Sequence, residues 1–359
     1  MELDGDKATI EALAQVSPGG GVRAGLDRIL QARMGALLVI GDGPEVLSIC
    51  SGGFLIDAEF SPQRLYELAK MDGAIILSRD ASRLARANVH LVPDPRLPTT
   101  ETGTRHRTAE RVARTVNVPI VAVSEELGVI TVYRGDKKRQ LQPIVEVWAR
   151  TNQALATLER YKERLDRVLR RLSDLEKAAQ TTFRDVVLVL QRAELVRRIS
   201  EEINWFLVEL GSDGRMLSLQ LDELYLDIRG DYDYVITDFL GPCSEGDANE
   251  IRNYLASLAM DDLLDVRMLA LGIMKRAKCP ELVDFDISSE VDPLSLILIS
   301  RGKRFLSLVP KLPKAVQERV LDNFGDVLEL CNVSEFELSK VDGVGETWAK
   351  AIKDFVDEQ

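Results

Sequence analysis

The spacing of apolar residues changes twice along this chain. Over residues 1 to about 145, short apolar runs of strand length alternate with stretches of helical spacing, with turn residues between them. The runs that we expect to form strands are ALLVI (36–40), VLSIC (46–50), GAIIL (73–77), VHLV (89–92), PIVAV (119–123) and VITVY (129–133). The pattern predicts an α/β domain in which helices flank a mixed sheet.

Helix signals lie between these strands. Ser61 followed by Pro62 is a favourable helix start, because serine caps the first turn and proline fits its first position. Asp80 is a candidate cap for the next helix. In TAERVARTV (108–116) the apolar residues share one face, which predicts an amphipathic helix that begins near Thr108.

From about 146 to 289 the spacing is helical throughout. Two heptad series run together here, Leu158, Leu165 and Leu172 beside Tyr161, Val168 and Leu175. Interleaved heptads make a seam for helix packing. A long helix within a bundle explains them better than a dedicated coiled-coil partner, so we expect an all-α spine.

Residues 290–359 contain a weak internal repeat with a period of 32 residues. The apolar positions Leu306, Val309, Leu312, Val316 and Val320 recur as Leu338, Val341, Val344, Trp348 and Ile352. The second copy, LSKVDGVGETWAKAI (338–352), resembles a helix-hairpin-helix motif, whereas the first copy has Lys311-Leu312-Pro313 in place of the glycine turn. We therefore expect a multidomain chain, α/β at residues 1–145 and all-α at residues 146–289 and 290–359.

The two hairpins are candidate DNA contacts. Glycines in the second hairpin allow a tight turn whose backbone N–H groups can approach a phosphate. Asp342 and Glu346 flank that turn and repel phosphate, whereas the first copy is more basic. The residues that we expect to contact DNA are Arg301, Lys303, Arg304, Gly343 and Gly345. A structural or docking module without DNA contact is the open alternative.

Composition limits the class of protein. The chain has 359 residues, is 45% hydrophobic and 29% charged, and carries a formal net charge of −12. These values fit globular domains and argue against general coating of nucleic acid. No apolar stretch approaches the roughly 18 residues that a membrane helix needs, and the acidic N-terminus lacks the layout of a secretory signal, so we expect a cytoplasmic protein. The four cysteines form no CxxC pair, which predicts neither a zinc site nor a disulfide framework.

Two short motifs in the N-terminal region can carry chemistry. Asp72-Gly73-Ala74 opens an apolar run, where an acid is presented at a strand edge and glycine lets a ligand approach the backbone; an ordinary turn is the alternative. Gly103-Thr104-Arg105-His106-Arg107-Thr108 runs into the predicted helix. Helix N-termini attract anions and arginine forks suit phosphate oxygens. Exposed loop arginines with a packing or capping histidine are the alternative here.

The sequence DGA, followed about thirty residues later by GTRHRTAER, resembles the signature of the diadenylate cyclase (DAC) domain family. The surrounding segments GALLVIGD (35–42), AKMDGAIILSRD (69–80), ANVHLVPDP (87–95) and VAVSEELGVITVYRG (121–135) agree with it. Three-part members of the family add a helical spine and a C-terminal helix-hairpin-helix domain. The resemblance thus covers nearly the whole chain in the same order.

The resemblance implies a nucleotidyltransferase that condenses two ATP into cyclic di-AMP and releases pyrophosphate. It implies that Asp72 acts on the attacking 3′-hydroxyl, as a base or through a metal, and that Gly73 approaches the nucleotide. Leu91 is expected to line the adenine pocket, with simple strand packing as the alternative. Ser124 is a candidate phosphate contact and Glu125 a candidate metal ligand, unless both belong to an ordinary turn. The residues implied for the triphosphate are Thr104, Arg105, His106, Arg107 and Thr108.

The resemblance also implies a cofactor and partners. Mg²⁺ or Mn²⁺ is expected, because transfer at a triphosphate usually needs a hard cation. Family members assemble as homo-octamers, and the C-terminal domain implies DNA, branched structures included, as a partner in DNA-damage sensing. A non-enzymatic, nucleotide-sensing DNA-binding protein is the alternative function. A kinase-type site is disfavoured, since the chain has no GxxxxGK[ST] motif.

Overall fold

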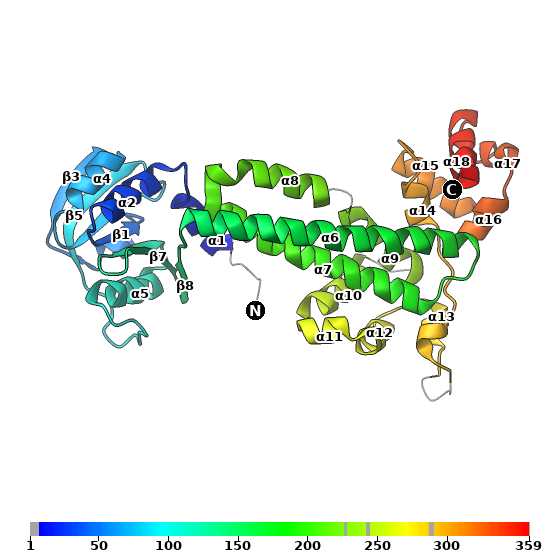
Figure 1. The fold of residues 1–359 in the computed structure, drawn as a ribbon, viewed down its shortest axis with the longest axis horizontal. Coiled ribbons are helices and arrows are strands. Elements are labelled where there is room, and N and C mark those ends of the chain that lie inside the picture. The colour runs from blue at the N-terminus through cyan, green and yellow to red at the C-terminus, as the bar shows by residue number, and fades with distance from the viewer. Residues whose placement is uncertain (1–6, 226–227, 242–244, 287–290, 359) are drawn as a thin grey trace. The chain divides into compact units, whose positions relative to one another are not determined.

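The computed structural model describes residues 7–225, 228–241, 245–286 and 291–358. The chain divides into two compact units, residues 1–155 with 201–221 and residues 156–200 with 222–359. The boundaries between the units fall within or beside long helices (Figure 1). The three-domain division at 145/146 and 289/290 stays a prediction.

The first unit is built on one mixed sheet. Its strands are β1 (Ala36–Ile40), β2 (Cys50–Ser51), β3 (Phe54–Glu59), β4 (Ala74–Leu77), β5 (Arg83–Leu91), β6 (Ile120–Ser124), β7 (Val129–Arg134) and β8 (Lys137–Gln140). They lie in the order β2-β5-β4-β1-β6-β7-β8, with β3 also paired to β5. Only β1 and β4 run parallel among these pairs, and the others are antiparallel. The predicted mixed sheet is confirmed.

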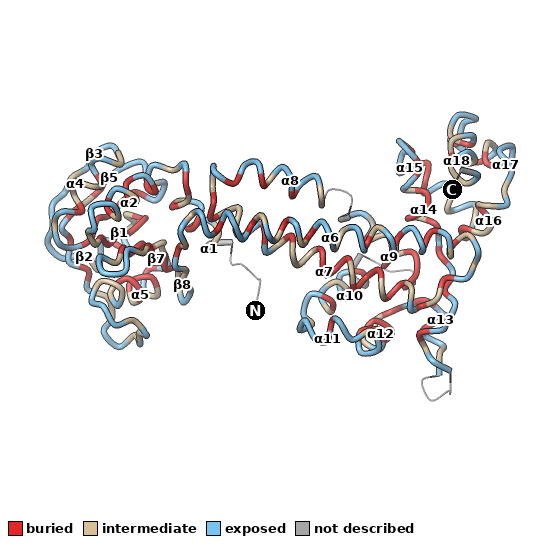
Figure 2. Tube along the Cα trace, in the orientation of Figure 1, coloured by how far each residue is buried: buried red, intermediate tan, exposed pale blue. Residues whose placement is uncertain are grey.

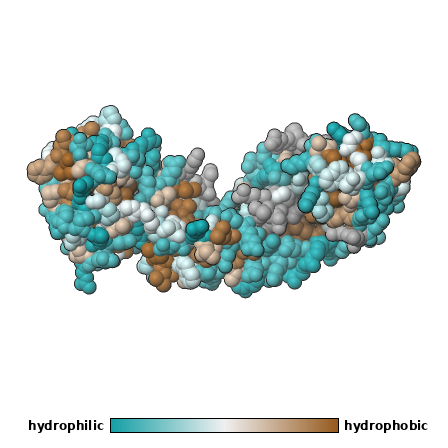
Figure 3. Space-filling model, turned by 90° about the horizontal axis from the view of Figure 1, so that it is seen from above, coloured by the Kyte–Doolittle hydropathy of each residue, from teal (hydrophilic) through white to brown (hydrophobic). Residues whose placement is uncertain are grey.

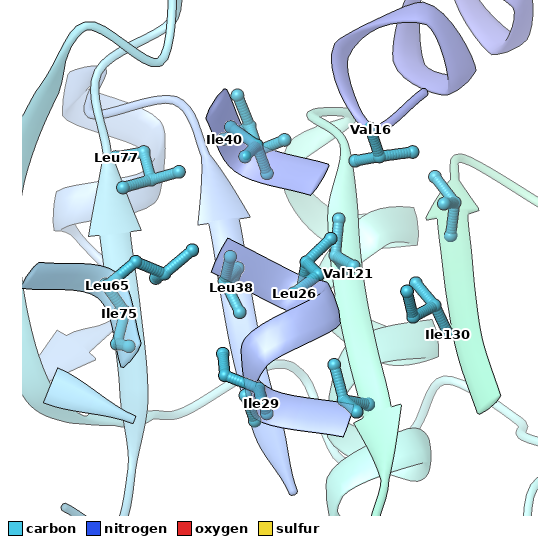
Figure 4. Packing of buried hydrophobic residues seen from close by; sticks show 14 of the residues in the cluster. Val16, Leu26, Ile29, Leu38, Ile40, Leu65, Ile75, Leu77, Val121 and Ile130 are labelled. Atoms are coloured by element: carbon cyan, nitrogen blue, oxygen red, sulfur yellow. The ribbon is translucent and has the colours of Figure 1, made fainter. Parts of the chain in front are cut away.

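Helices cover both faces of this sheet. The helices of the region are α1 (Lys7–Gln15), α2 (Gly21–Gln31), α3 (Pro44–Leu47), α4 (Pro62–Leu68) and α5 (Thr104–Val116). Leu26 of α2 and Leu65 of α4 pack against Leu38 in one core (Figure 4), while Val112 of α5 packs against Val39 in the other. Since β1, β4 and β6 are buried on both faces, they appear in the sequence as unbroken apolar runs.

Of three helix and strand predictions around the sheet, one is confirmed and two are wrong. The predicted helix start at Ser61 is confirmed, and its Oγ accepts the backbone N–H of Arg64 at 3.2 Å. The strand predicted at 46–50 is wrong, because Pro44 opens the short helix α3 there. The helix cap predicted at Asp80 is also wrong. That carboxylate accepts the hydroxyl of Ser78 within the turn between β4 and β5, and such bonds lower the pKa of Asp80 to about 2.

The rest of the described chain is helical. Between the sheet and the repeat region its helices are α6 (Ile144–Lys177), α7 (Phe183–Leu210), η1 (Gly211–Gly214), α8 (Arg215–Tyr225), α9 (Ile228–Phe239), α10 (Glu245–Ser257), α11 (Met260–Leu264), α12 (Val266–Met274), α13 (Pro280–Val283) and η2 (Pro293–Ser295). Buried and exposed positions alternate along α6 (Figure 2). Leu158, Leu165 and Leu172 are each at most 1% exposed, which confirms the first predicted heptad series, whereas Tyr161, Val168 and Leu175 of the second are half-buried.

The repeat region folds into two helix–turn–helix pairs around one core. Its helices are α14 (Lys303–Ser307), α15 (Lys314–Asn323), α16 (Val327–Asn332), α17 (Glu335–Ser339) and α18 (Glu346–Glu358). Every apolar position of the 32-residue repeat packs in this core. Lys311 and Gly343, equivalent positions in the repeat, both have positive φ, 60° and 75°. The left-handed turn is therefore present in both hairpins, although only the second has glycine there.

The remaining findings concern membrane-spanning helices, the surface and the cysteines. No helix in the described ranges is long and apolar enough to cross a bilayer. On the face drawn in Figure 3, hydrophilic residues cover much of the surface and hydrophobic residues gather in separate patches. Cys50, Cys279 and Cys331 form no disulfide, while Cys243 lies outside the described residues. Residues 287–290, just before the repeat, also lie outside them.

Candidate active site

A pocket of about 480 Å³ opens in the first unit where several central strands of the sheet begin or end. Its lining comes from β1, β4, β5, α5 and β6. Its lining includes most of the expected site residues, namely Gly73, Leu91, Thr104, Arg105, His106, Thr108, Ser124 and Glu125. Ala74 and Gly103, which the motifs contain but to which no role was given, also line it, and the sequence prediction missed Leu37, Val89, His90 and Glu126.

α5 begins at this pocket. Gly103 caps the helix in an extended conformation, and the N–H of Arg107 donates to the Gly103 carbonyl at 2.9 Å. The three N–H groups between these residues lie ahead of the intrahelical hydrogen-bond ladder. The predicted helix start near Thr108 is wrong, because the backbone becomes helical four residues earlier. The Thr-Arg-His-Arg motif is therefore the first turn of a helix and not a loop.

Arg105 is held over a glycine that the sequence prediction did not single out. A Cβ at Gly35 would lie 2.0 Å from Nη1 of Arg105 and 2.4 Å from its Cζ. The half-buried guanidinium thus occupies the space that a side chain at Gly35 would fill. Gly35 lies just before β1, so the first strand of the sheet helps to place an arginine of the motif.

His106 is the start of a hydrogen-bonded chain. Its Nδ1 lies 2.8 Å from the hydroxyl of Tyr133, which donates to Oε1 of Glu101 at 3.0 Å. Burial lowers the pKa of His106, and the nearby Glu101 charge opposes that shift. The sequence prediction missed both partners. A signal for one existed, because a tyrosine in a buried strand usually finds a partner for its hydroxyl.

The packing of β4 against β5 requires a glycine at position 73. Its φ is +88°, and a Cβ there would lie 2.9 Å from the carbonyl oxygen of Val89 on β5. The register between β4 and β5 is irregular beside it, a feature common next to active sites. Asp72 is exposed immediately before this glycine. Neither Asp72 nor Arg107 belongs to the lining of the pocket.

The structure is compatible with both the site role and the structural role considered for Leu91, Ser124 and Glu125. Leu91 is 5% exposed and belongs to the core beneath α5, yet it also lines the pocket. The Oγ of Ser124 accepts the N–H of Leu127 at 3.2 Å, as in an ordinary turn. Glu125 is an exposed lining residue. Among the described residues, no group of three or more His, Cys, Asp and Glu side chains is suited to hold a metal.

The second unit contains a cavity of about 400 Å³ lined by residues of α7, α8, α9 and α10 that the prediction did not include. Its two arginines face acids. Arg197 pairs with Glu194 at 2.7 Å, and Arg252 pairs with Asp233 at 2.7 Å. Because these cations are already neutralised, the cavity offers a weaker anion site than the pocket in the first unit.

The residues expected to contact DNA separate into two kinds. Arg301, Gly343 and Gly345 are exposed and Lys303 is half-buried. Arg304 is only 1% exposed, so the prediction that it contacts DNA is wrong: its guanidinium is enclosed in the protein.

The two glycines of the second hairpin differ in their surroundings. A Cβ at Gly343 would lie 1.5 Å from Nη1 of Arg319, which donates to the carbonyl of Asp342 at 3.2 Å. At Gly345 nothing lies within 4 Å of the added atom. The backbone is thus open to a ligand at Gly345, whereas an arginine covers it at Gly343.

Comparison with known proteins shows similarity over most of the chain. A family model described as "DisA bacterial checkpoint controller nucleotide-binding" matches residues 23–138, and one described as "DisA bacterial checkpoint controller linker region" matches residues 141–278. The chain is 45% identical over 351 residues to the DNA integrity scanning protein DisA of Frankia alni, covering 98% of this chain and 94% of that protein. It is 43% identical to the protein of the same name from Streptomyces coelicolor, covering 96% and 89%. The relative from Kineococcus radiotolerans is 45% identical, with 97% and 94% covered.

Proposed function

The chain belongs to the DisA family and is a diadenylate cyclase, and from this premise we propose that two facing cyclase domains each hold one ATP. Each 3′-hydroxyl attacks the α-phosphorus of the other ATP. Two new phosphate–oxygen bonds replace the two bonds to pyrophosphate, so two pyrophosphates leave and the two hydroxyls each lose a proton. The observation that carries the proposal is the pocket, which brings part of each motif together, and each motif occurs once in the chain. The second ATP must therefore come from another copy.

The first turn of α5 is the proposed triphosphate site. Its free N–H groups and helix dipole favour negative charge. Two arginines at this end of a helix repel the dipole, which a bound polyanion would offset. Charge develops on the leaving pyrophosphate, so the donors of this turn act in the transition state as well as in binding. The residues assigned to the triphosphate are Thr104, Arg105, His106, Arg107 and Thr108.

Asp72 is proposed to act on the attacking 3′-hydroxyl. It is exposed beside the pocket, next to Gly73, where an ATP can reach it. The family implies a divalent cation, and the carboxylates present fit one that is held mainly by substrate, since Mg²⁺ commonly uses one or two carboxylates plus phosphate oxygens. Asp72 and Glu125 are the proposed ligands. The cation, Mg²⁺ or Mn²⁺, would offset charge on the phosphates.

The adenine is assigned to the wall formed by β5. Leu91 offers apolar surface there, and Ser124 on the opposite side of the pocket can contact a phosphate. These roles follow from the lining of the pocket together with the family resemblance. An octamer, in which spines pair the cyclase faces, is the assembly that the family implies.

DNA binding is assigned to the C-terminal hairpins. Arg301 and Lys303 supply positive charge, and Gly345 supplies an open backbone next to the N-terminus of α18. The role would couple DNA structure or damage to cyclase activity. Removing residues 290–359 should abolish binding of branched DNA, and binding by the full chain should weaken steeply with salt. Unchanged affinity after charge reversal at Arg301 and Lys303 would contradict this assignment.

The cyclase assignment is tested by incubating the purified chain with ATP and Mg²⁺ or Mn²⁺ and identifying products by mass. Cyclic di-AMP and pyrophosphate are expected. Asp72→Asn should lower turnover by roughly 10²-fold or more while ATP binding persists, because the phosphates are held elsewhere. Glu126→Gln is a matched control, a carboxylate at the pocket with no assigned role. Normal turnover by the Asp72 variant would refute the role given to Asp72.

A further inference from the structure

A buried tyrosine joins the candidate active site to an acidic residue outside it. Tyr133 lies on β7 and is 1% exposed, and its hydroxyl contacts two side chains from other segments. One is Nδ1 of His106, at 2.8 Å, and the other is Oε1 of Glu101, at 3.0 Å. Nζ of Lys138 also donates to Oε1 of Glu101, at 3.0 Å. Four segments of the chain thus converge on one hydrogen-bonded line.

The protons along this line can be assigned. Burial raises the pKa of Tyr133 well above its ordinary value, so the hydroxyl keeps its single proton. Burial alone would raise the pKa of Glu101, but hydrogen bonds from Lys138 and Tyr133 outweigh it and hold that pKa below its ordinary value. Glu101 is therefore a carboxylate, which can only accept.

It follows that the hydroxyl proton of Tyr133 points to Glu101. The tyrosine oxygen is then an acceptor toward His106, and Nδ1 of His106 must carry a proton. The other ring nitrogen, Nε2, is left for the pocket that His106 lines. In a neutral imidazole the partner of one nitrogen decides the state of the other.

We propose that Tyr133 is a positioning residue of the cyclase site, which fixes His106 in its Nδ1–H form and presents Nε2 to the bound nucleotide. The inference rests on the triphosphate role proposed for His106. A bare Nε2 cannot donate to a phosphate oxygen, so it takes up a proton when the negative triphosphate binds, while Nδ1–H stays on Tyr133. Tyr133 itself touches no reacting atom. Glu101 orients the tyrosine, and Lys138 orients Glu101. The arrangement also fixes the plane of the imidazole ring, since the hydroxyl contacts it from one side.

The tautomer can be observed directly. The chain has two histidines, His90 and His106, so histidine labelled with ¹⁵N gives two imidazole spectra. Solid-state NMR of the sedimented full-length protein does not depend on assembly size, and His90→Gln assigns the spectra. We expect Nδ1 of His106 to be protonated in the wild-type protein without nucleotide. A bare Nδ1 with a protonated Nε2 would overturn the proposal before any tyrosine variant is made.

The functional test is Tyr133→Phe, which removes the hydroxyl and keeps the ring that packs in the core. We expect kcat to fall by about tenfold or more. Binding of 3′-deoxy-ATP, which lacks the attacking hydroxyl, should change much less, and the His106 spectrum should show a mixture of tautomers. Tyr66→Phe is the matched control, because Tyr66 is half-buried against the opposite core. It should leave kcat unchanged.

A double-mutant cycle separates positioning from a general structural role. In a His106→Gln background, Tyr133→Phe should cause no further loss of kcat, whereas a structural role would add its full effect. Glu101→Gln retains an acceptor oxygen for Tyr133 and should therefore lose less activity than Tyr133→Phe.

The outcomes also separate the role proposed for Tyr133 from the triphosphate role proposed for His106. If His106→Gln alone leaves turnover intact, the triphosphate role of His106 fails, and this inference fails with it. If that variant is inactive but Tyr133→Phe retains both kcat and the tautomer, only the role of Tyr133 fails.

Discussion

Arg304 of α14 and Glu176 of α6 form an ion pair whose side chains are 2% and 0% exposed. Oγ of Ser173 accepts a further hydrogen bond from Arg304 at 2.9 Å. On the other side, the carboxylate of Asp238 accepts the backbone N–H groups of Arg304 at 2.6 Å and Lys303 at 3.1 Å. The start of α14 is therefore anchored to its neighbours by buried charges.

Arg304→Ala should destabilise the second unit by about 3–5 kcal/mol, because it leaves Glu176 buried without a countercharge. The measurement is urea unfolding followed by the fluorescence of Trp348, which packs in the C-terminal core. The other tryptophans, Trp148 and Trp205, are replaced by phenylalanine for this purpose.

Arg301→Ala is the matched control for Arg304→Ala. Arg301 is exposed, so its loss should change stability by no more than about 0.5 kcal/mol while lowering DNA affinity. If Arg304→Ala kept full stability and lost only DNA affinity, the buried pair would have no structural role.

The stability of the second unit should depend on pH through Asp238. Burial raises the pKa of this group to about 7, against an ordinary value of 3.8, although backbone N–H groups oppose the shift. Between these values the folded chain binds a proton that the unfolded chain has lost, so the free energy of unfolding falls as pH rises from about 4 to 7. Comparing wild type with Asp238→Asn across that range isolates the effect. If the free energy of unfolding had the same pH dependence in the two proteins, Asp238 would not be the group responsible.

Gly35→Ala should impair catalysis with little change in stability. The new methyl group would displace the guanidinium of Arg105, which is the end of a flexible side chain and can move. A small misplacement of a binding group can lower turnover by roughly 10²-fold. Steady-state rates and thermal unfolding measure the two effects. Gly325→Ala is the control, since its added Cβ would meet only ordinary contacts.

The double variant Gly35→Ala with Arg105→Ala shows whether the glycine acts through the arginine. It should be no slower than Arg105→Ala alone. Additive losses would mean that Gly35 affects the strand β1 and not the guanidinium.

Lys311→Gly should stabilise the C-terminal core. Lys311 has a φ of 60°, a conformation that costs a residue with a side chain roughly 1–2 kcal/mol, whereas glycine adopts it freely. Part of the gain is lost to the greater freedom of glycine in the unfolded chain, so we expect a net gain of up to about 1 kcal/mol. This gain in the free energy of unfolding is measured by urea unfolding of the protein that keeps Trp348 as its single tryptophan. Lys350→Gly, within the exposed face of α18, should instead cost about 1 kcal/mol.

The strands that could be predicted from sequence are those buried on both faces. β1, β4 and β6 appear as unbroken apolar runs, because neither face can carry polar residues. β3 and β8 were missed. FLIDAE is largely exposed, with only Ile56 and Ala58 alternating with polar residues, and KKRQ contains no apolar residue. Their pairing depends on the neighbouring strands β5 and β7, which local sequence does not reveal.

The candidate site was predicted through its motifs and not through its supports. Gly73, Arg105 and His106 belong to short motifs that sequence resemblance can identify. Gly35 and Tyr133 act on those residues from other elements, so only the tertiary structure brings them together. The same limit explains Arg304. Its basic neighbourhood suggested an exposed cluster, and nothing local indicates that one of three cations faces inward.

The close approach of Gly73 to β5 has a consequence for nucleotide binding. One wall of the pocket is set by the spacing of two hydrogen-bonded strands, which leaves no room for a side chain at this position. The conformational entropy of that wall is thus lost when the sheet folds and not when ATP arrives. Preorganisation of this kind leaves more of the contact free energy for affinity. Gly73→Ala would therefore disturb the empty pocket as much as the filled one.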